Sequence, residues 1–375
     1  MTILLRINLD IEGNRPEKSL RFSRAVETIK KLSKNDKVVI LSHYGRPNGF
    51  DSKLSLKKFR RPLEKALGNK IVFIPISQIN KASSNIKKSG AGSIFLLDNL
   101  RFVNGETKNS VEFSKLLAGL GDKYINDDFA TSHRADASTV EIAKFLPSQP
   151  GDNLIREIKA LKKISRSRKP FVLIIGGVKI SDKAGVIKNL ISKIDFILLG
   201  GGPANTFLKA RGADIGQSIF EKEMIGEVRK LSRNKKIIVP EDSVWSNNAI
   251  LDIGPKTAKN YSAIIQKANT IVWSGPMGLF ENPKFAKGTK SIWQAVMHNR
   301  QATSVVGGGE TLASLKLVYK NHKVNKNICL LTGGGAMLYF LAGKKLPALV
   351  ALKIQKNNST SARRDRQRTN PPSRS

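Results

Sequence analysis

Four runs of apolar residues that each end in glycines constrain the fold of this chain more than any other feature. They are FVLIIGG at 171–177, FILLGGG at 196–202, SVVGGG at 304–309 and CLLTGGG at 329–335. A buried strand that ends in glycines and opens into a helix leaves backbone N–H groups and the positive end of the helix dipole facing outward, and chains hold phosphate in this way without side chains. One such run alone would indicate a tight turn. The repetition favours a sheet whose carboxyl edge binds phosphate.

The remainder of the chain alternates short apolar runs with amphipathic stretches. Candidate strands occur at 3–8, 37–43, 71–76, 92–98 and 123–129, and candidate helices at 24–32, 55–67 and 110–120. This alternation is typical of βαβ units and of a parallel sheet. It resumes at Phe171 and continues to about Leu331, so we expect an α/β fold with a parallel sheet in each half.

The length of 375 residues favours two domains over one. Between the two alternating regions the sequence predicts an amphipathic helix with Asp152 as its N-cap. Its apolar face would be formed by Leu154, Ile155, Ile158, Leu161 and Ile164. The predicted organisation is a first domain at 1–150, a connecting helix and linker at 151–168, a second domain at 169–335, a segment at 336–352 that could pack back on the first domain, and a disordered basic tail at 353–375.

The chain is strongly basic, with 65 Lys and Arg against 29 Asp and Glu and a net charge of +36. Such a surplus attracts nucleic acid, anionic membranes or phosphorylated metabolites. The lysines are spread along the chain and aromatic residues make up only 6%, so nucleic acid is expected to bind only non-specifically, through charge. The single cysteine, Cys329, fits a reducing compartment. Residues 1–10 fit neither a signal peptide nor a membrane span, so the expected location is the cytoplasm, with no membrane partner.

Arginines and histidines recur where strands of the first half are predicted to end. They are His43, Arg46, Arg101, His133 and Arg134. Ligands of open α/β sheets bind outside the carboxyl ends of the strands. Guanidinium groups match the geometry of phosphate and carboxylate, so these residues predict a clamp for a small anion.

The second half carries residues suited to a nucleotide. Lys179 and Lys183 are four residues apart, and we expect both on one side of a helix that starts directly after glycines. Glu281 could accept a hydrogen bond from a ribose hydroxyl, with an exposed glutamate as the alternative. Glu310 is a hard oxygen ligand suited to Mg²⁺, and Thr311 lies beside it. In these glycine-rich stretches, no Lys followed by Ser or Thr stands at the offset after G-x-x-x-x-G that a Walker A loop requires.

An anion clamp in one half and a phosphate site in the other favour phosphoryl transfer. Catalysis of that reaction rests mainly on in-line positioning and on neutralised charge. Closure about a hinge would exclude the water that otherwise hydrolyses the donor.

A series of motifs carries a resemblance to a known family. In chain order they are LSHYGRP, NLRF, NDDFATSHRA, GGVKISDK, GGGPANTFL, DIGPKT, GPMGLFE, FAKGT, GGGET and TGGGA. Over residues 3–352 the chain resembles phosphoglycerate kinase. The resemblance implies two Rossmann-like three-layer domains whose parallel sheets face each other across a hinge cleft, in a monomer. It also implies a glycolytic enzyme that reversibly transfers a phosphoryl group from 1,3-bisphosphoglycerate to MgADP, giving 3-phosphoglycerate and ATP.

The resemblance also implies roles for particular residues. Those implied for the phosphoglycerate are Asn8, Asp10, Arg21, His43, Tyr44, Gly45, Arg46, Arg101 and Arg134. Those implied for the nucleotide are Lys179, Lys183, Gly201, Glu281, Gly308, Gly309, Glu310, which would also hold Mg²⁺, and Thr311. Arg21, Lys183 and Gly334 would act on the transferring phosphoryl group, and Arg24 is the alternative assignment for Arg21.

Two alternatives to a working kinase stay open at this point. One is a degenerate relative that binds nucleotide without turnover, because Asn8 and Asp10 exchange the two polar types of the family pattern and Glu310 stands where the family has an aspartate. The other is a basic nucleic-acid-binding protein on an enzyme scaffold.

Overall fold

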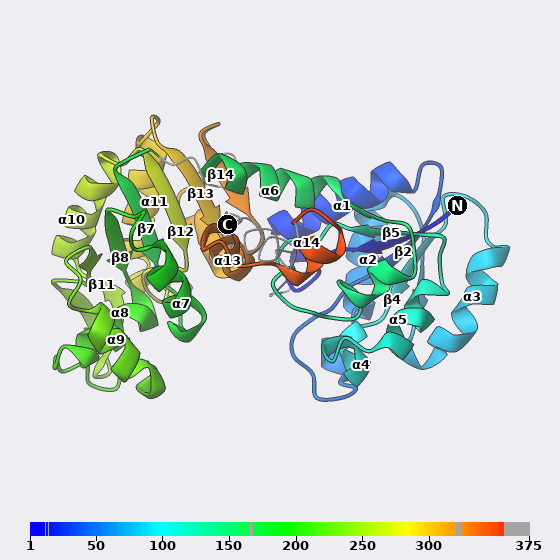
Figure 1. The fold of residues 1–375 in the computed structure, drawn as a ribbon, viewed down its shortest axis with the longest axis horizontal. Coiled ribbons are helices and arrows are strands. Elements are labelled where there is room, and N and C mark those ends of the chain that lie inside the picture. The colour runs from blue at the N-terminus through cyan, green and yellow to red at the C-terminus, as the bar shows by residue number, and fades with distance from the viewer. Residues whose placement is uncertain (12, 14, 165–167, 320–323, 356–375) are drawn as a thin grey trace, which may run out of the picture.

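The computed structural model describes residues 1–11, 13, 15–164, 168–319 and 324–355. Of the tail predicted to be disordered, 353–375, residues 356–375 lie outside the described residues, whereas in 353–355 the N–H groups of Ile354 and Gln355 donate to Leu349 O. Figure 1 shows two α/β bodies side by side, the N-terminal half in blue to cyan and the C-terminal half in green to yellow. The long helix α6 (Asp152–Ile164) runs between them.

The N-terminal half contains a six-stranded sheet in which every pair of neighbours is parallel, in the order β3-β4-β2-β1-β5-β6. Its strands are β1 (Thr2–Arg6), β2 (Lys37–Leu41), β3 (Ile71–Ile74), β4 (Ile94–Leu97), β5 (Lys123–Asn126) and β6 (Ser148–Pro150). Both faces are buried. Along β1, Ile3 and Leu5 enter one core cluster and Leu4 the other, as the alternation of side chains in a strand requires.

Helices cover both faces of this sheet. They are α1 (Leu20–Leu32), α2 (Lys57–Leu67), α3 (Ile79–Lys88), α4 (Asn104–Thr107) and α5 (Val111–Ala118). Helices α1 and α2 pack on one face, and α3 and α5 on the other. Helix α3 was not predicted, although its buried residues Ile79, Ala82 and Ile86 recur at helical spacing in a polar stretch, which is an amphipathic pattern.

The C-terminal half repeats the arrangement with a parallel six-stranded sheet in the order β14-β13-β12-β7-β8-β9. Its strands are β7 (Phe171–Ile175), β8 (Phe196–Leu199), β9 (Ile237–Ile238), β12 (Thr270–Ser274), β13 (Thr303–Gly307) and β14 (Ile328–Leu331). An antiparallel pair, β10 (Ser243–Ser246) and β11 (Ala249–Ile253), was not predicted. Asn247 and Asn248, both with positive φ, form its two-residue turn, a conformation that asparagine tolerates.

The helices of the C-terminal half are α7 (Ser181–Leu190), α8 (Gly201–Ala210), α9 (Ile225–Leu231), α10 (Pro255–Gln266), α11 (Lys287–His298), α12 (Gly309–Ala313), α13 (Gly334–Leu341) and α14 (Pro347–Ala351). Helices α10 and α11 cover one face of the sheet, and α7 and α8 the other. The predicted fold class, two α/β units with parallel sheets between helix layers, is confirmed.

The connecting helix α6 buries Leu154, Ile158, Leu161 and Ile164 along the predicted face. The predicted N-cap is wrong by one residue. Asp152 lies in the first turn of α6, where Lys31 of α1 donates to its carboxylate, and the carbonyl of Gly151 accepts from Ile155 N–H. An acidic residue in the first turn still complements the helix dipole.

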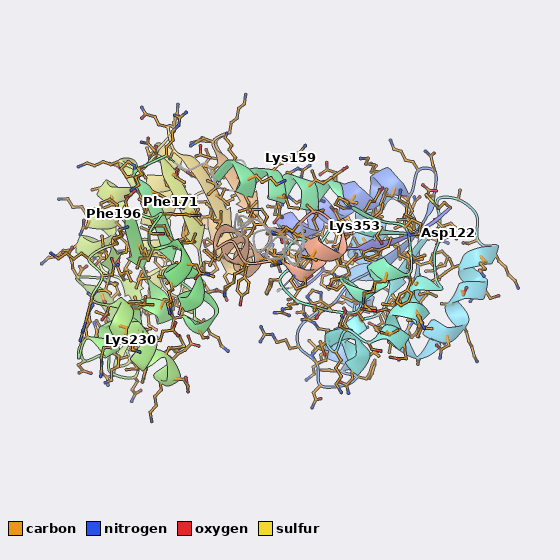
Figure 2. All side chains as sticks on the ribbon, viewed as in Figure 1. Asp122, Lys159, Phe171, Phe196, Lys230 and Lys353 are labelled. Carbon is orange, nitrogen blue, oxygen red and sulfur yellow. The ribbon has the colours of Figure 1, made fainter. Side chains whose placement is uncertain are left out.

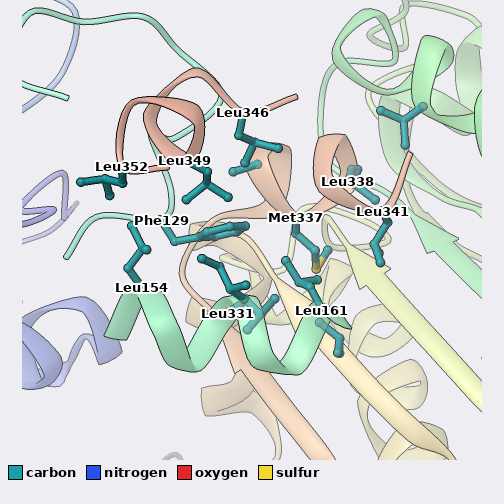
Figure 3. Close-up of a cluster of buried hydrophobic side chains, with 14 of the residues drawn as sticks. Phe129, Leu154, Leu161, Leu331, Met337, Leu338, Leu341, Leu346, Leu349 and Leu352 are labelled. Atoms are coloured by element: carbon teal, nitrogen blue, oxygen red, sulfur yellow. The ribbon is translucent and has the colours of Figure 1, made fainter. Parts of the chain in front are cut away.

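A continuous group of apolar side chains joins the two halves. Figure 3 shows Phe129 of the N-terminal half beside Leu154 of α6, Leu331 of β14 and Leu349 of α14. The N–H of Ala348 donates to the carbonyl of Ser132, so the C-terminal segment contacts the N-terminal half.

Charged side chains extend from the surface of both halves, many of them with nitrogen tips (Figure 2), in keeping with the net charge of +36. Among the described residues, we find no helix that combines the length and apolar character needed to cross a membrane.

Candidate active site

The carboxyl edge of the N-terminal sheet is organised around Arg6, which ends β1 and is fully buried. Its guanidinium donates to Asp128 Oδ2 at 3.0 Å, to Ser138 Oγ at 3.0 Å and to His43 Nδ1 at 2.8 Å. Arg6 was not among the site residues predicted from the sequence. A charged residue at the carboxyl end of an otherwise apolar strand was the signal that could have identified it.

His43 is held in one protonation state. Arginine can only donate, so Nδ1 accepts from Arg6 and the ring proton lies on Nε2, which faces Asp10 Oδ2 at 3.9 Å. Burial holds the pKa of His43 well below its ordinary value, and Arg6, Arg101, Arg134 and Arg21 lower it further. The imidazole is therefore a neutral donor beside a group of guanidinium ions.

Arg101 lies in the same group, with only 7% of its surface exposed. Its Nη1 donates to Gly45 O at 2.7 Å, and its Nη2 lies 3.8 Å from Asp136 Oδ2 without a hydrogen-bond partner among the described residues. Burial and then the neighbouring Arg134 lower the pKa of Arg101. Cations gathered at this density favour an anion in contact with them.

The loop after β2 is tied to the same edge. Asp10 Oδ1 accepts from Gly45 N–H at 2.9 Å, and Tyr44 N–H donates to Asn99 Oδ1 at 3.2 Å. Asn8 Oδ1 accepts from Asp10 N–H at 3.0 Å. Asp10 is thus occupied in part by the loop. Arg46, by contrast, is exposed.

Arg21 joins the two sheet edges. Its Nη1 donates to Asp10 O and its Nη2 donates to Thr332 O at 2.9 Å. A Cβ placed on Gly309 would lie 3.3 Å from the same Nη2, so the guanidinium reaches the glycine loop after β13. Arg24 points instead to the connecting helix, where it pairs with Glu157. The geometry favours Arg21 over Arg24 as the site residue.

The glycines of the C-terminal half meet at the carboxyl edge of its sheet, where backbone segments touch. A Cβ on Gly176 would lie 2.0 Å from Pro276 O, and one on Gly202 would lie 1.9 Å from Val178 O. A Cβ on Gly334 would lie 3.0 Å from Gly308 Cα. Side chains are excluded here by contact with neighbouring backbone. The edge therefore presents peptide groups at the starts of α8 and α13.

Lys183 lies over this edge. Its Nζ donates to Gly176 O at 2.6 Å, and a Cβ on Gly177 would lie 3.5 Å from both Lys183 Nζ and Glu310 Oε2. The predicted placement of Lys179 on the same helix is wrong, because α7 begins only at Ser181. The carboxylate of Glu221 fixes that start by accepting from Ser181 N–H at 2.9 Å and Ser181 Oγ at 2.6 Å, which leaves Lys179 exposed in the preceding loop.

Of the remaining residues predicted to bind the nucleotide, some are part of the glycine loops and their hydrogen bonds, and Glu281 is exposed. Thr311 is buried and its Oγ1 accepts from Gly275 N–H at 2.7 Å. Gly308 has a φ of 107° at the N-cap of α12, a conformation that favours glycine. Gly201 has a φ of 56° at the start of α8. Glu281 is exposed after the turn that follows β12.

Glu310 fits the requirements of Mg²⁺ carried by a nucleotide. Its carboxylate is exposed on α12, next to the glycine loop and Lys183. In proteins Mg²⁺ is commonly held by one or two carboxylates together with substrate phosphates. No group of three or more His, Cys, Asp or Glu that could hold a metal ion occurs among the residues that the structure describes.

Comparison with known proteins adds an independent line of evidence. Residues 1–344 match the family model described as phosphoglycerate kinase. A phosphoglycerate kinase from Dictyoglomus turgidum is 38% identical over 384 residues, covering 94% of this chain and 95% of the relative. The structure of phosphoglycerate kinase from Pyrococcus horikoshii has a TM-score of 0.82 at 31% identity, and that from Coxiella burnetii 0.69 at 34%, each covering 94% of this chain and 96% of the other. The chain therefore belongs to the phosphoglycerate kinase family, which confirms the family, the enzyme class and the glycolytic function that its motifs predict.

Proposed function

We propose that the N-terminal edge holds 3-phosphoglycerate or 1,3-bisphosphoglycerate through its arginines. Arg101 and Arg134 would bind the anion, with Arg46 at the exposed rim and His43 donating from Nε2. Two observations support this assignment: the buried Nη2 of Arg101 has no hydrogen-bond partner within the described part of the chain, and the pKa of His43 is lowered. Asn8, Asp10, Tyr44 and Gly45 would shape the loop around the ligand.

The C-terminal edge would hold ATP or ADP. Backbone N–H groups at Gly201 and at Gly308 to Thr311 would face the phosphates, and Glu281 the ribose. Glu310 would hold Mg²⁺, which supplies charge neutralisation on the phosphate oxygens when bound. The contacts that exclude side chains from this edge support the assignment.

Phosphoryl transfer would take place between the two edges. Lys183 would follow the transferring group as a mobile positive charge, Arg21 would hold its oxygens from the opposite side, and the N–H of Gly334 would donate to them. The acceptor is the carboxylate of 3-phosphoglycerate in one direction and ADP in the other. Closure of the two halves would exclude water from this space.

The organisation of the chain fits this reaction. We assign residues 1–150 to the phosphoglycerate domain, 169–335 to the nucleotide domain and 151–168 to their connection, with 336–352 contacting the first domain through Ala348. The protein is proposed to act as a monomer in the cytoplasm.

The single observation that carries the proposal is the position of Arg21, which donates to Asp10 O in one half and to Thr332 O in the other. The test is a coupled assay with MgATP and 3-phosphoglycerate. Turnover is expected.

If the unchanged chain shows no turnover but Glu310→Asp or the double change Asn8→Asp/Asp10→Asn restores it, the defect lies at the departures from the family pattern. Lack of turnover in all of them would overturn the proposal in favour of the degenerate alternative, which nothing in the comparisons favours. Salt-dependent binding of unrelated DNA or RNA that survives removal of the tail, residues 353–375, would support a separate nucleic-acid role.

A further inference from the structure

A second arginine on α1, Arg24, contacts two other parts of the fold at once. Its Nη1 donates to Glu157 Oε1 of α6 at 2.8 Å, and its Nη2 donates to the carbonyl of Leu330 in β14 at 2.9 Å. The side chain is 12% exposed and that of Glu157 is 1% exposed. One guanidinium therefore ties the N-terminal half to the connecting helix and to the sheet of the C-terminal half.

Glu157 extends the contact to the loop that carries Gly333 and Gly334. Its Oε1 accepts from Thr332 N–H at 2.9 Å and from Thr332 Oγ1 at 2.7 Å. Thr332 O is in turn the acceptor of Arg21 Nη2. We call Arg24, Glu157 and Thr332 the junction network. It connects the residue proposed to contact the transferring phosphoryl group with the place where the two halves meet.

Burial of the Arg24–Glu157 pair costs desolvation free energy. A buried ion pair often stabilises a fold no more than apolar residues of the same size would. Burial raises the pKa of Glu157, and Arg24 is the strongest influence that opposes the rise. Since the pair is weak evidence for stability, its directional contacts need another explanation.

We propose that Arg24 is a positioning residue, which through Glu157 and Thr332 holds Arg21 and the start of α13 in register when the two halves close. The proposal rests on the function assigned above. Arg21 and Arg24 are three residues apart on α1 and so lie on one face of it. Movement of α1 relative to β14 is transmitted to Arg21 through the two arginine-to-carbonyl contacts, at Leu330 and Thr332.

The chain offers a matched control on the same two helices. Lys31 of α1 pairs with Asp152 of α6, but their side chains are 65% and 59% exposed. This second pair links the same helices without contact to the C-terminal sheet among the bonds described. Lys31→Met therefore removes an α1 to α6 ion pair while leaving the junction network unchanged.

The experiment compares Arg24→Met, Arg24→Lys, Arg24→Met/Glu157→Gln and Lys31→Met with the unchanged chain. For each we measure kcat and KM, the 3-phosphoglycerate dissociation constant of the free enzyme, the melting temperature, and the radius of gyration with and without 3-phosphoglycerate plus MgADP. The double variant removes the uncompensated carboxylate but keeps an oxygen that accepts from Thr332, so it separates stability from positioning.

We expect Arg24→Met to lower kcat by roughly tenfold to a hundredfold, with little change in the dissociation constant and a smaller ligand-induced decrease in the radius of gyration. Arg24→Lys should recover part of the loss, because one ammonium can reach Glu157 but lacks the fork that also reaches Leu330. The double variant should regain melting temperature but not kcat. Lys31→Met should match the unchanged chain.

Recovery of kcat together with melting temperature in the double variant would show a purely structural role and overturn the inference. So would an Arg24→Met enzyme as active as Lys31→Met. If Arg24→Met does not fold, Arg24→Lys and the double variant decide the question by the same criteria. Absence of turnover in the unchanged chain would instead be a failure of the proposed function.

Discussion

The two sheet edges that form the candidate site differ in the groups that they present to a ligand. The N-terminal edge relies on buried charged side chains, with Arg6 and His43 fully enclosed and Arg101 nearly so. The C-terminal edge relies on bare backbone, with glycines packed where a Cβ would meet a carbonyl at 1.9–2.0 Å. Both solutions suit an anion, but the first depends on charge and the second on the absence of side chains.

This difference predicts different consequences of mutation. A charge removed from the N-terminal edge leaves buried partners uncompensated, so stability and binding should fall together. A methyl group added to the C-terminal edge obstructs the backbone surface itself, so ligand affinity should fall even where the fold survives.

The largest expected effect is on the stability of the N-terminal edge. Arg6→Met leaves the buried Asp128 without its ion pair and should cost about 3–5 kcal/mol of unfolding free energy, measured by guanidinium denaturation. Arg46→Met, at an exposed position of the same edge, should stay within about 0.5 kcal/mol. Equal shifts in the two variants would contradict the assignment of Arg6 as the buried centre.

The next largest effect concerns Lys183, whose ammonium group lies over the glycine edge. Lys183→Ala should lower kcat by on the order of a hundredfold to a thousandfold, with much less change in KM, because the charge matters most in the transition state. Lys179→Ala should have a smaller effect, since Lys179 precedes α7. Steady-state kinetics on both variants provide the check, and an unchanged kcat in Lys183→Ala would show that the wrong lysine was assigned.

A matched pair of glycines tests whether bare backbone is what the C-terminal edge requires. A Cβ on Gly334 would meet Ser274 Oγ at 2.8 Å and Gly308 Cα at 3.0 Å, whereas one on Gly335 would meet its first neighbour, His133, at 3.8 Å. Gly334→Ala should weaken MgADP binding by about tenfold, or about 1.4 kcal/mol, and Gly335→Ala should leave it nearly unchanged. Calorimetric titration distinguishes them, and equal affinities would argue against a backbone site.

The effect expected to be smallest at pH 7 is the pH dependence contributed by His43. The unfolded chain takes up a proton on this residue as the pH falls through about 6.5, whereas the buried imidazole, with its lowered pKa, stays neutral. The folded state should therefore lose up to about 1.4 kcal/mol per pH unit below that value. In His43→Asn, where the amide oxygen can replace Nδ1, this slope should be absent.

Unfolding measured from pH 7 to 5 in both proteins tests the difference. Buried carboxyl groups with raised pKa values, such as Glu106 and Glu157, act in the opposite direction, but they act in both proteins and cancel. Parallel pH profiles would mean that His43 takes up its proton as readily in the folded state as in the unfolded chain, and would contradict the lowered pKa.

The contrast between the edges also explains what the sequence could predict. The phosphate-binding edge could be predicted, because repeated glycine runs after apolar strands occur in few other structures. The alternation of strands and helices predicted both parallel sheets. Arg6 and Glu157 were missed because their partners are far away in the sequence, at Asp128 and Arg24. A charge in an apolar context has no interpretation until the fold supplies its partner.

The start of a helix was the second feature that the sequence could not predict. The spacing of Lys179 and Lys183 would place them on one face of a helix, but the distant Glu221 sets the start of α7. In the same way Asp152 lies in the first turn of α6 and not at its N-cap, because the distant Asp127 accepts from the N–H groups of Asn153 and Leu154 at this end of the helix. Tertiary hydrogen bonds, which a single sequence does not display, decided both boundaries.

The most direct test of the account is calorimetric titration of Arg101→Met/Arg134→Met with 3-phosphoglycerate and, separately, with MgADP. If charged side chains hold one substrate and backbone holds the other, the variant should lose measurable 3-phosphoglycerate binding while its MgADP dissociation constant stays within about twofold of the unchanged chain. Retained binding of 3-phosphoglycerate, or loss of both ligands in a variant that remains folded, would contradict it.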